Sequence, residues 1–202
     1  NSRKFAEMET LYLTGSSGGL GREVRSYFIE RGWNVAGFDA FDDEFRHAQF
    51  FFQKIDSTSE DSIAIAFGEA VKKFGAPRTL LATIGGLKPW ADLEEISEND
   101  FHFILDLNVT ATFLCVKQAV KLMKPLGKGT IITVGADTAL HSEPKKTIYI
   151  AAKAAVIAMT ESLAEETKAY GVNTNCIAPK VIHTKANESW GSSEEIPTWT
   201  EP

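Results

Sequence analysis

The sequence predicts an α/β protein built on one doubly wound parallel sheet, and two observations support this expectation. Short apolar runs alternate with helical periods along the chain, which is typical of strand–helix–strand units. The strand-like runs are apolar throughout rather than at every second residue, which indicates a parallel sheet covered by helices on both faces. The 202 residues show no linker and no internal repeat, so we expect a single domain over 1–202.

Six strands and four helices are expected in alternation. The position of Ser57 relative to Glu60 has the spacing of a capping box, and Ser97 and Asp100 introduce a later helix in the same way. The predicted strands are 10–15, 33–39, 51–55, 79–86, 129–135 and 172–179, and the predicted helices are 20–31, 57–74, 98–124 and 149–170.

The last segment, residues 184–202, has neither a helical nor a strand period. It is polar with scattered tryptophans, which predicts a loop that covers the substrate. A frayed terminus is the alternative interpretation.

Composition excludes several classes of protein. Hydrophobic residues make up 44% and charged residues 24%, which is ordinary for a soluble globular protein. The net charge of −6 disfavours nucleic-acid and anionic-membrane partners. Apolar runs are short and interrupted by charges, so we expect no membrane span, and the first residues lack a signal-peptide core. Cys115 and Cys176 have no metal spacing, so we expect buried free thiols, no metal site and a cytoplasmic protein.

A glycine-rich turn, "TGSSGGLG" (14–21), lies between the first strand and the first helix. Gly15 permits a tight turn, while Gly19 and Gly21 permit close backbone approach and tight helix packing. The start of the helix then offers free N–H groups and the positive end of its dipole to a pyrophosphate. This indicates a Rossmann-type dinucleotide-binding fold, and a purely structural turn is the alternative. The predicted cofactor contacts in this loop are Gly15, Ser17, Gly19, Leu20 and Gly21.

An acidic residue, Asp39, ends the second predicted strand. A carboxylate at this place accepts hydrogen bonds from the ribose hydroxyls of NAD and repels the 2′-phosphate of NADP. The loop contains no Arg or Lys, and the residues after Asp39 are "AFDDE". The sequence therefore predicts NAD(H) as the cofactor and NADP(H) as the less suitable one. A solvated turn carboxylate is the alternative interpretation of Asp39.

Tyr149 and Lys153 are spaced i and i+4 at the head of an Ala-rich helix, so they share one helix face. A nearby cation favours the phenolate form, so Lys153 is expected to lower the pKa of Tyr149. Such a tyrosine could exchange a proton with a substrate. Alone, the pair would be interpreted as a surface contact; together with the glycine loop it indicates a redox site.

These motifs together resemble the short-chain dehydrogenase/reductase family. The resemblance covers about residues 8–185 and follows the family order. After the glycine loop and Asp39 come Asp56 behind the third strand, Gly85 behind the fourth, Asn108 on the long helix, Tyr149 with Lys153, and Pro179 and Thr184 behind the sixth strand.

The resemblance implies roles for these positions. Asp56 would contact adenine, Ile182 the nicotinamide amide, and Thr184 the carboxamide or the phosphates. Asn108 would hold a proton-relay water, and Lys153 would also hold the nicotinamide ribose. Gly85 and Pro179 would complete the cofactor-binding set.

Three departures from the family pattern limit the reaction. The fourth-strand motif is "ATIG" rather than Asn-Asn-Ala-Gly, and Pro179 is followed by Lys180 rather than glycine. The catalytic serine that normally lies thirteen residues before the tyrosine is Ala136. Losing such a donor costs on the order of 3–4 kcal/mol. Either Thr138 or Thr133 substitutes, or the substrate is activated enough to react without it, or the chain binds cofactor without turnover.

The second of these interpretations has a precedent, because dihydropteridine reductase also lacks the serine and reduces an electron-poor quinonoid imine with NADH. "GWNVAGFDAFDDE" and "TIGGLKPW" resemble that branch, and so does Ala136, whereas Asn108 departs from it. Trp90 and Trp190 fall on loops expected to flank the nicotinamide, where a flat substrate could stack. Ordinary loop anchoring is the alternative. The candidate substrate-side residues are Ala136, Trp90 and Trp190.

The sequence therefore predicts an NADH-dependent oxidoreductase acting on a small activated carbonyl, imine or quinonoid compound. The alternatives are a non-catalytic NAD-binding protein and an ordinary alcohol or ketone dehydrogenase that uses Thr138. The helices at 98–124 and 149–170 are expected to pair in a homodimer or homotetramer. Family members usually continue into another helix and strand, so the resemblance also implies that a C-terminal part is missing or truncated.

Overall fold

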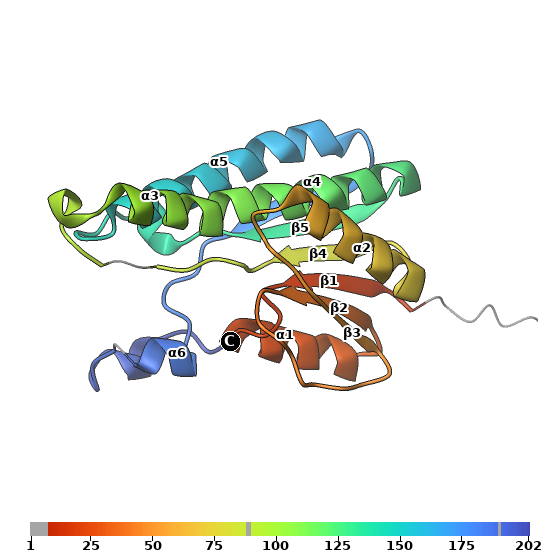
Figure 1. Ribbon diagram of the computed structural model, residues 1–202, viewed down its shortest axis with the longest axis horizontal. Coiled ribbons are helices and arrows are strands. Elements are labelled where there is room, and N and C mark those ends of the chain that lie inside the picture. Colours follow the sequence, from red (N-terminus) through yellow and green to blue (C-terminus); the bar gives the residue numbers. More distant parts are fainter. Residues whose placement is uncertain (1–7, 88–89, 190) are drawn as a thin grey trace, which may run out of the picture.

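The computed structural model describes residues 8–87, 90–189 and 191–202. Its sheet has six parallel strands in the order β3-β2-β1-β4-β5-β6 (Figure 1). The order runs outward from β1 in both directions, which confirms the doubly wound prediction. The strands are β1 (Thr10–Thr14), β2 (Asn34–Asp39), β3 (Phe50–Lys54), β4 (Thr79–Ala82), β5 (Gly129–Val134) and β6 (Val172–Ile177).

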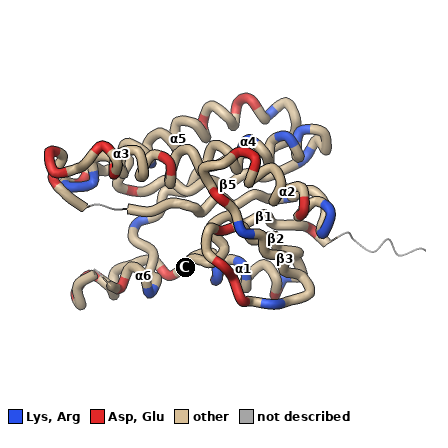
Figure 2. The backbone as a smooth tube through the Cα atoms, viewed as in Figure 1, with Lys and Arg blue, Asp and Glu red and all other residues tan. Residues whose placement is uncertain are grey.

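Helices cover the two faces of the sheet unequally. One face carries α2, α4 and α5, with α3 leading into α4, while α1 packs on β1 and β2 from the other face (Figure 1). The helices are α1 (Gly19–Glu30), α2 (Glu60–Phe74), α3 (Glu98–Leu105), α4 (Ala111–Met123), α5 (Thr147–Lys168) and α6 (Lys185–Glu188). Acidic and basic residues are interspersed over both layers (Figure 2).

An aromatic cluster forms the centre of the core under α2. The buried Tyr12 ring lies 5.3 Å from the Phe38 ring and 5.1 Å from the Phe67 ring, and its hydroxyl donates to Gly75 O at 3.1 Å. Burial without a charged partner raises the pKa of Tyr12, so the phenol stays neutral and acts as a core donor. Packing at this point fixes β1, whose carboxyl end carries the glycine loop.

Several predicted boundaries differ from the structure by one or two residues, and two differ by more. The fourth strand ends at Ala82 rather than Gly86, because its neighbour β1 ends at Thr14 opposite Ala82 and offers no further partner. The second helix is capped by Ser59, whose hydroxyl accepts from the Ser62 amide, rather than by Ser57.

The predicted helix at 98–124 is continuous in the structure, but its hydrogen-bonding pattern changes along its length. Residues Asp106–Thr110 form a π-helical turn between α3 and α4, and a short 3-10 turn with Pro125 ends the path. Hydrophobic periodicity does not reveal this turn, because the segments on either side of it each keep a helical period. π-helical turns of this kind are frequent at functional sites.

The C-terminal segment is more ordered than the sequence predicts. The segment contains the short helix α6 and a 3-10 turn at Ile196–Thr198. The backbone before α6 and the backbone after the turn pair through an isolated bridge between Ile182 and Thr200. His183 joins both ends through Glu188 Oε1 at 2.7 Å and Glu201 Oε1 at 3.0 Å. The segment is therefore a closed loop rather than a frayed terminus.

Among the residues that the structure describes, two helical stretches are long and apolar enough to cross a membrane by length and composition alone. They are Glu98–Leu126, with 44% of its window buried, and Thr147–Lys168, with 22% buried. Both pack on the sheet here, and core helices of sheet proteins often meet the same criterion, so this is weak evidence for a span. Of the two cysteines, Cys115 is a buried free thiol as predicted, while Cys176 is only half-buried.

Candidate active site

The glycine loop connects β1 to α1 at the carboxyl edge of the sheet. Gly15 adopts a positive φ of 71°, and a Cβ there would lie 2.6 Å from Thr83 Oγ1. A Cβ on Gly21 would lie 2.1 Å from Gly15 O, so the first helical turn packs directly against the loop backbone. These two positions require glycine for the reasons the motif predicts.

The N-terminus of α1 has no side-chain cap, because its N-cap residue is Gly18. Above it lies Thr184, whose Cβ would be 2.7 Å from a Cβ built on Gly19. The structure therefore brings the predicted loop residue Gly19 and the predicted post-β6 residue Thr184 into contact. This arrangement fits a pyrophosphate group, because it offers free amides, the positive end of a helix dipole and a close approach that a Cβ on Gly19 would block. Leu20 follows on the first turn and is half-buried.

Asp39 is tied into the glycine loop rather than solvated. The side chain is 8% exposed, Oδ2 accepts from the Ser17 amide at 3.0 Å, and Oδ1 accepts from the Phe41 amide at 3.1 Å. A buried carboxylate beside an uncapped helix N-terminus places negative charge next to the pyrophosphate cradle. This position fits a ribose with free hydroxyls and is unfavourable for an additional phosphate.

The loops after β3 and β6 hold the other predicted cofactor residues. Asp56 is exposed behind β3, and hydrogen bonds from the Thr58 hydroxyl and amide hold its pKa below the usual range. Pro179 O accepts from the Asp137 amide at 2.9 Å, and Ile182 O accepts from Asn187 Nδ2 at 2.8 Å. Among the residues described, the only non-glycine positive φ is at Lys145. Lys180 therefore replaces the usual glycine without backbone strain.

Tyr149 and Lys153 lie on one face of α5, as predicted. Lys153 Nζ is 5.8 Å from the centre of the Tyr149 ring and donates to Val134 O at 2.9 Å. Burial raises the pKa of Tyr149 to about 12 and lowers the pKa of Lys153 to about 8. The pKa of Tyr149 is therefore raised overall rather than lowered as expected, because burial of the phenol outweighs the effect of the nearby Lys153 ammonium.

Gly85, Asn108 and Lys153 converge at the end of β4. A Cβ on Gly85 would lie 2.7 Å from Asn108 Oδ1 and 2.9 Å from Lys153 Nζ. Asn108 is fully buried in the π-helical turn. Its amide group donates to Gly86 O and Ile104 O, and Oδ1 accepts from the Gly86 amide. The Asn108 side chain thus pins the loop after β4 to the long helix beside Lys153.

The missing serine leaves an apolar surface at the end of β5. Ala136 is buried and extended, and the chain turns directly afterwards into a 3-10 turn that packs on α5. That turn carries Thr138, whose buried hydroxyl oxygen has no hydrogen-bond partner among the residues that the structure describes. Thr133, the other candidate substitute, is paired with Thr160 at 2.7 Å and is not free to serve a substrate.

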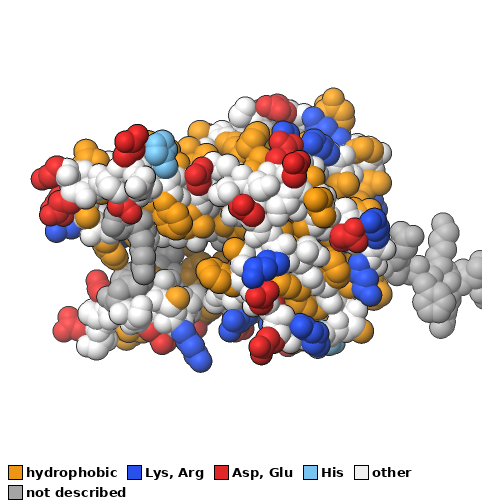
Figure 3. All heavy atoms as spheres, viewed as in Figure 1, with side chains coloured by type: hydrophobic (Ala, Val, Ile, Leu, Met, Phe, Trp, Pro, Cys, Tyr) orange, Lys and Arg blue, Asp and Glu red, His pale blue; other side chains and the backbone are white. Residues whose placement is uncertain are grey.

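Trp90 lies at the mouth of this region and is 46% exposed. Lys146 Nζ is 4.3 Å from the centre of the Trp90 ring and 2.6 Å from Glu143 Oε2. This contact ties the loop after β4 to the head of the Tyr149 helix. Trp190, the other predicted substrate-side tryptophan, lies outside the described residues. Figure 3 shows hydrophobic and charged side chains interspersed over this face of the molecule.

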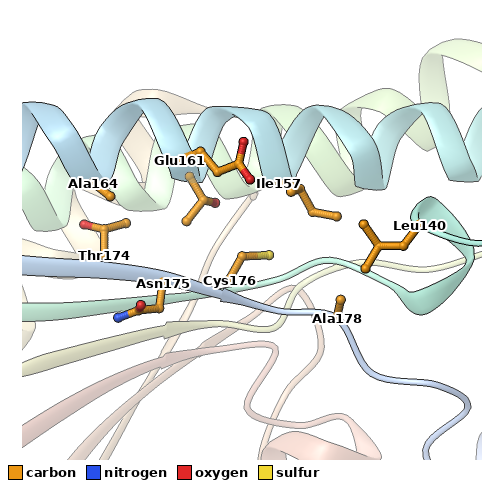
Figure 4. A pocket seen from close by; sticks show the side chains of 9 residues that line it. Leu140, Ile157, Glu161, Ala164, Thr174, Asn175, Cys176 and Ala178 are labelled. Atoms are coloured by element: carbon orange, nitrogen blue, oxygen red, sulfur yellow. The ribbon is translucent and has the colours of Figure 1, made fainter.

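A separate cavity of about 330 Å³ lies between α5 and the edge strand β6 (Figure 4). Neither Tyr149, Lys153 nor the glycine loop contributes to it, so it is distinct from the candidate active site. Its lining residues are Leu140, Ile157, Thr160, Glu161, Ala164, Thr174, Asn175, Cys176 and Ala178.

Sequence reasoning missed three residues that shape the site. The Thr83 hydroxyl donates to Thr14 O at 2.6 Å beside Gly15, Ser16 Oγ packs against Gly37, and Lys146 holds Trp90. Thr83 and Lys146 could have been suspected from their positions at a strand end and one turn before Tyr149. The Ser16 contact depends on packing of the glycine loop against strand β2 and leaves no signal in the sequence.

Comparison with known proteins agrees with this geometry. The family model described as short chain dehydrogenase matches residues 9–195. An uncharacterised oxidoreductase of Thermotoga maritima is 30% identical over 182 residues, which cover 85% of this chain and 70% of that protein.

Solved structures show the same fold. ElxO with NADP bound superposes with a TM-score of 0.89 at 23% identity, covering 96% of this chain and 86% of that one. A 3-ketoacyl-(acyl-carrier-protein) reductase from Brucella melitensis complexed with NADH gives a TM-score of 0.88 at 21% identity, covering 97% and 86%. The family model and the relatives together establish that this chain belongs to the short-chain dehydrogenase family of oxidoreductases.

Proposed function

We propose that this chain is an NADH-dependent reductase of a small activated carbonyl, imine or quinonoid compound. The observation that carries the proposal is geometric: Tyr149 and the buried Lys153 share one face of α5, and the apolar Ala136 follows β5 at the edge of the sheet that also holds the glycine loop. The nicotinamide, when bound, supplies the hydride.

Tyr149 is the proton donor in this proposal. With a pKa raised to about 12, its phenol is protonated at neutral pH and can pass the proton from Oη to a substrate oxygen or nitrogen. Lys153 has a pKa near 8, so it is mostly charged at neutral pH. Its ammonium stabilises the phenolate that remains after proton transfer, and Asn108 keeps the neighbouring loop in place.

Asp39 supports NADH as the preferred cofactor. Its buried carboxylate faces the loop that would hold the pyrophosphate, where a 2′-phosphate would add like charge in a poorly solvated place. Replacement by asparagine keeps the shape and removes the charge. We expect Asp39→Asn to weaken NADH binding by about tenfold and to reduce the ratio of NADH affinity to NADPH affinity. Calorimetric titration of the variant and of wild type with each cofactor measures both effects. An unchanged preference would mean that other residues select the cofactor.

Ala136 supports the substrate class. A site without the serine hydroxyl cannot polarise a simple ketone from that position, so the substrate must already accept electrons readily. Quinonoid dihydropterin is the proposed model compound, in line with the local resemblance to dihydropteridine reductase. Trp90, half-exposed at the mouth, offers a flat surface for such a ring.

The alternative is an ordinary alcohol or ketone dehydrogenase that uses Thr138, and the unpartnered hydroxyl of that residue favours it. Thr138→Val removes the hydroxyl with little change of shape, and Thr138→Ser retains it. Under the main proposal, both variants reduce quinonoid dihydropterin at the wild-type rate. A large loss of activity on secondary alcohols in Thr138→Val alone would instead support the alternative.

A non-catalytic NAD-binding role is the remaining alternative, motivated by Ala136. Tyr149→Phe distinguishes it, because a catalyst loses turnover while keeping NADH affinity. A protein that only binds NADH would show no turnover even before the substitution.

We also propose a homodimer or homotetramer in the cytoplasm. The outer face of α5 presents Ala151, Ala154, Ala155 and Ala158 to solvent, and Phe113 on α4 is 46% exposed. A flat stripe of small residues allows two helices to approach closely. Light scattering on the purified chain tests the assembly.

A further inference from the structure

Phe41 is the most exposed large hydrophobic residue of the described chain, at 76%, yet both its backbone amide and its carbonyl are hydrogen-bonded. Its amide donates to Asp39 Oδ1 at 3.1 Å, and its carbonyl accepts from Ser17 Oγ at 3.2 Å. The Ser17 amide in turn donates to Asp39 Oδ2 at 3.0 Å. These bonds join the turn after β2 to the glycine loop as one unit, with the Phe41 side chain outside it.

A buried ion pair anchors the far side of the same connection. Arg25 of α1 pairs with Asp43, and the guanidinium carbon lies 4.0 Å from the centre of the Phe45 ring and 5.0 Å from that of Phe50. Asp43 Oδ1 also accepts from the Phe45 amide at 2.9 Å. The apolar space under this connection is therefore filled by other rings, and Phe41 has no place in the core.

The topology fixes what lies around Phe41. β2 and β3 are parallel neighbours with Asp39 opposite Lys54, and the Ile55 amide donates to Asp39 O at 2.9 Å. Phe41 and Asp56 therefore emerge at the same edge of the sheet, on the side of the glycine loop that bears Asp39. A dinucleotide whose phosphates contact that loop and whose ribose contacts Asp39 has its base at this end.

We propose that Phe41 stacks on the adenine ring of the dinucleotide, presented by a connection that the Arg25–Asp43 pair anchors. This inference rests on the proposed cofactor function. An aromatic side chain provides a face for any base, and loss of one base–aromatic stack weakens binding by about tenfold or more. The acidic Asp42 beside it is paired with Lys54 at 3.0 Å.

The test compares ligands that contain or lack adenine, in the purified full chain. ADP-ribose contains adenine and no nicotinamide, whereas reduced nicotinamide mononucleotide contains nicotinamide and no adenine. We expect Phe41→Ala to weaken ADP-ribose and NADH binding by about tenfold and to leave binding of the mononucleotide unchanged. Phe41→Trp should restore affinity to within about threefold, because it keeps the ring. Tyr27→Ala, a substitution of a half-exposed aromatic on α1, is the control and should change nothing.

Each other outcome is decisive. If wild type binds NADH and Phe41→Ala binds ADP-ribose equally well, the stacking inference is overturned while the proposed function stands. If Phe41→Ala weakens the mononucleotide to the same degree, the residue supports the loop generally and the inference also fails. A change of oligomeric state in Phe41→Ala, seen by light scattering, would assign the ring to a contact between copies instead. Absence of NADH binding by wild type would overturn the proposed function itself.

Discussion

Replacement of Lys153 by methionine should stabilise the fold while abolishing the proposed reaction. Lys153 is 4% exposed, and burial lowers its pKa from 10.5 to about 8. Each pKa unit is worth about 1.4 kcal/mol, so keeping the ammonium charged costs the folded state about 3 kcal/mol at neutral pH. Methionine has a similar length and no charge.

The expected gain is smaller than this cost, because Lys153 Nζ also donates to Val134 O. Losing that hydrogen bond removes about 1–1.5 kcal/mol. Lys153→Met should therefore gain about 2 kcal/mol at pH 7, which raises the melting temperature of a chain of this size by about 4–8 °C.

The pH dependence gives a sign that can be checked. Because the folded-state pKa lies below the unfolded one, the unfolded chain binds more protons between pH 8 and pH 10.5. The Lys153 contribution to wild-type stability therefore rises with pH in this window. Above pH 9, burial of Cys115 and Tyr149 acts in the opposite direction, since their pKa values are raised to about 12. Cys115 is common to both proteins, so its contribution cancels in the difference.

The assay is thermal unfolding of wild type, Lys153→Met and the exposed-surface control Lys128→Met from pH 7 to pH 10, without cofactor. The advantage of Lys153→Met over wild type should shrink as pH rises through 8, and Lys128→Met should match wild type. If Lys153→Met is less stable than wild type at pH 7, or its advantage does not vary with pH, the reasoning about the buried ammonium is refuted.

Two further substitutions test the loop contacts. Gly19→Ala would place a Cβ 2.7 Å from the Thr184 Cβ, so we expect weaker NADH binding with little change in melting temperature. Unchanged NADH affinity in a titration would contradict the assignment of this loop to the pyrophosphate. Asn108→Ala removes the side-chain partners of the partly buried Gly86 backbone groups and of the buried Ile104 carbonyl, so we expect a loss of about 2–4 kcal/mol in denaturant unfolding. A loss below about 1 kcal/mol would show that the loop after β4 does not depend on Asn108.

Much of the sheet could be predicted because its strands are apolar throughout. The glycine loop could be predicted because each of its glycines is required for a different steric reason. The end of β4 could not, since it depends on where β1 stops. Tyr149 and Lys153 could be predicted from their spacing. The direction of the Tyr149 pKa shift could not, because it depends on burial of the phenol, and spacing carries no information on burial.

The fixed position of Phe41 also escaped prediction. It arises from hydrogen bonds between the glycine loop and the turn after β2, and from the buried Arg25–Asp43 pair. These segments meet only after the sheet and α1 have packed, so the sequence alone gives an acidic turn with one aromatic residue in it.

The most direct test is turnover of quinonoid dihydropterin by the purified chain with NADH, followed by loss of NADH absorbance, for wild type and Tyr149→Phe. The NADH affinity of both proteins is measured in parallel by titration. The account predicts turnover by wild type, a loss of about a hundredfold to ten-thousandfold in Tyr149→Phe, and equal NADH affinity. Equal turnover by the two proteins, or tight NADH binding with no turnover of quinonoid, quinone or activated ketone substrates by wild type, would contradict it.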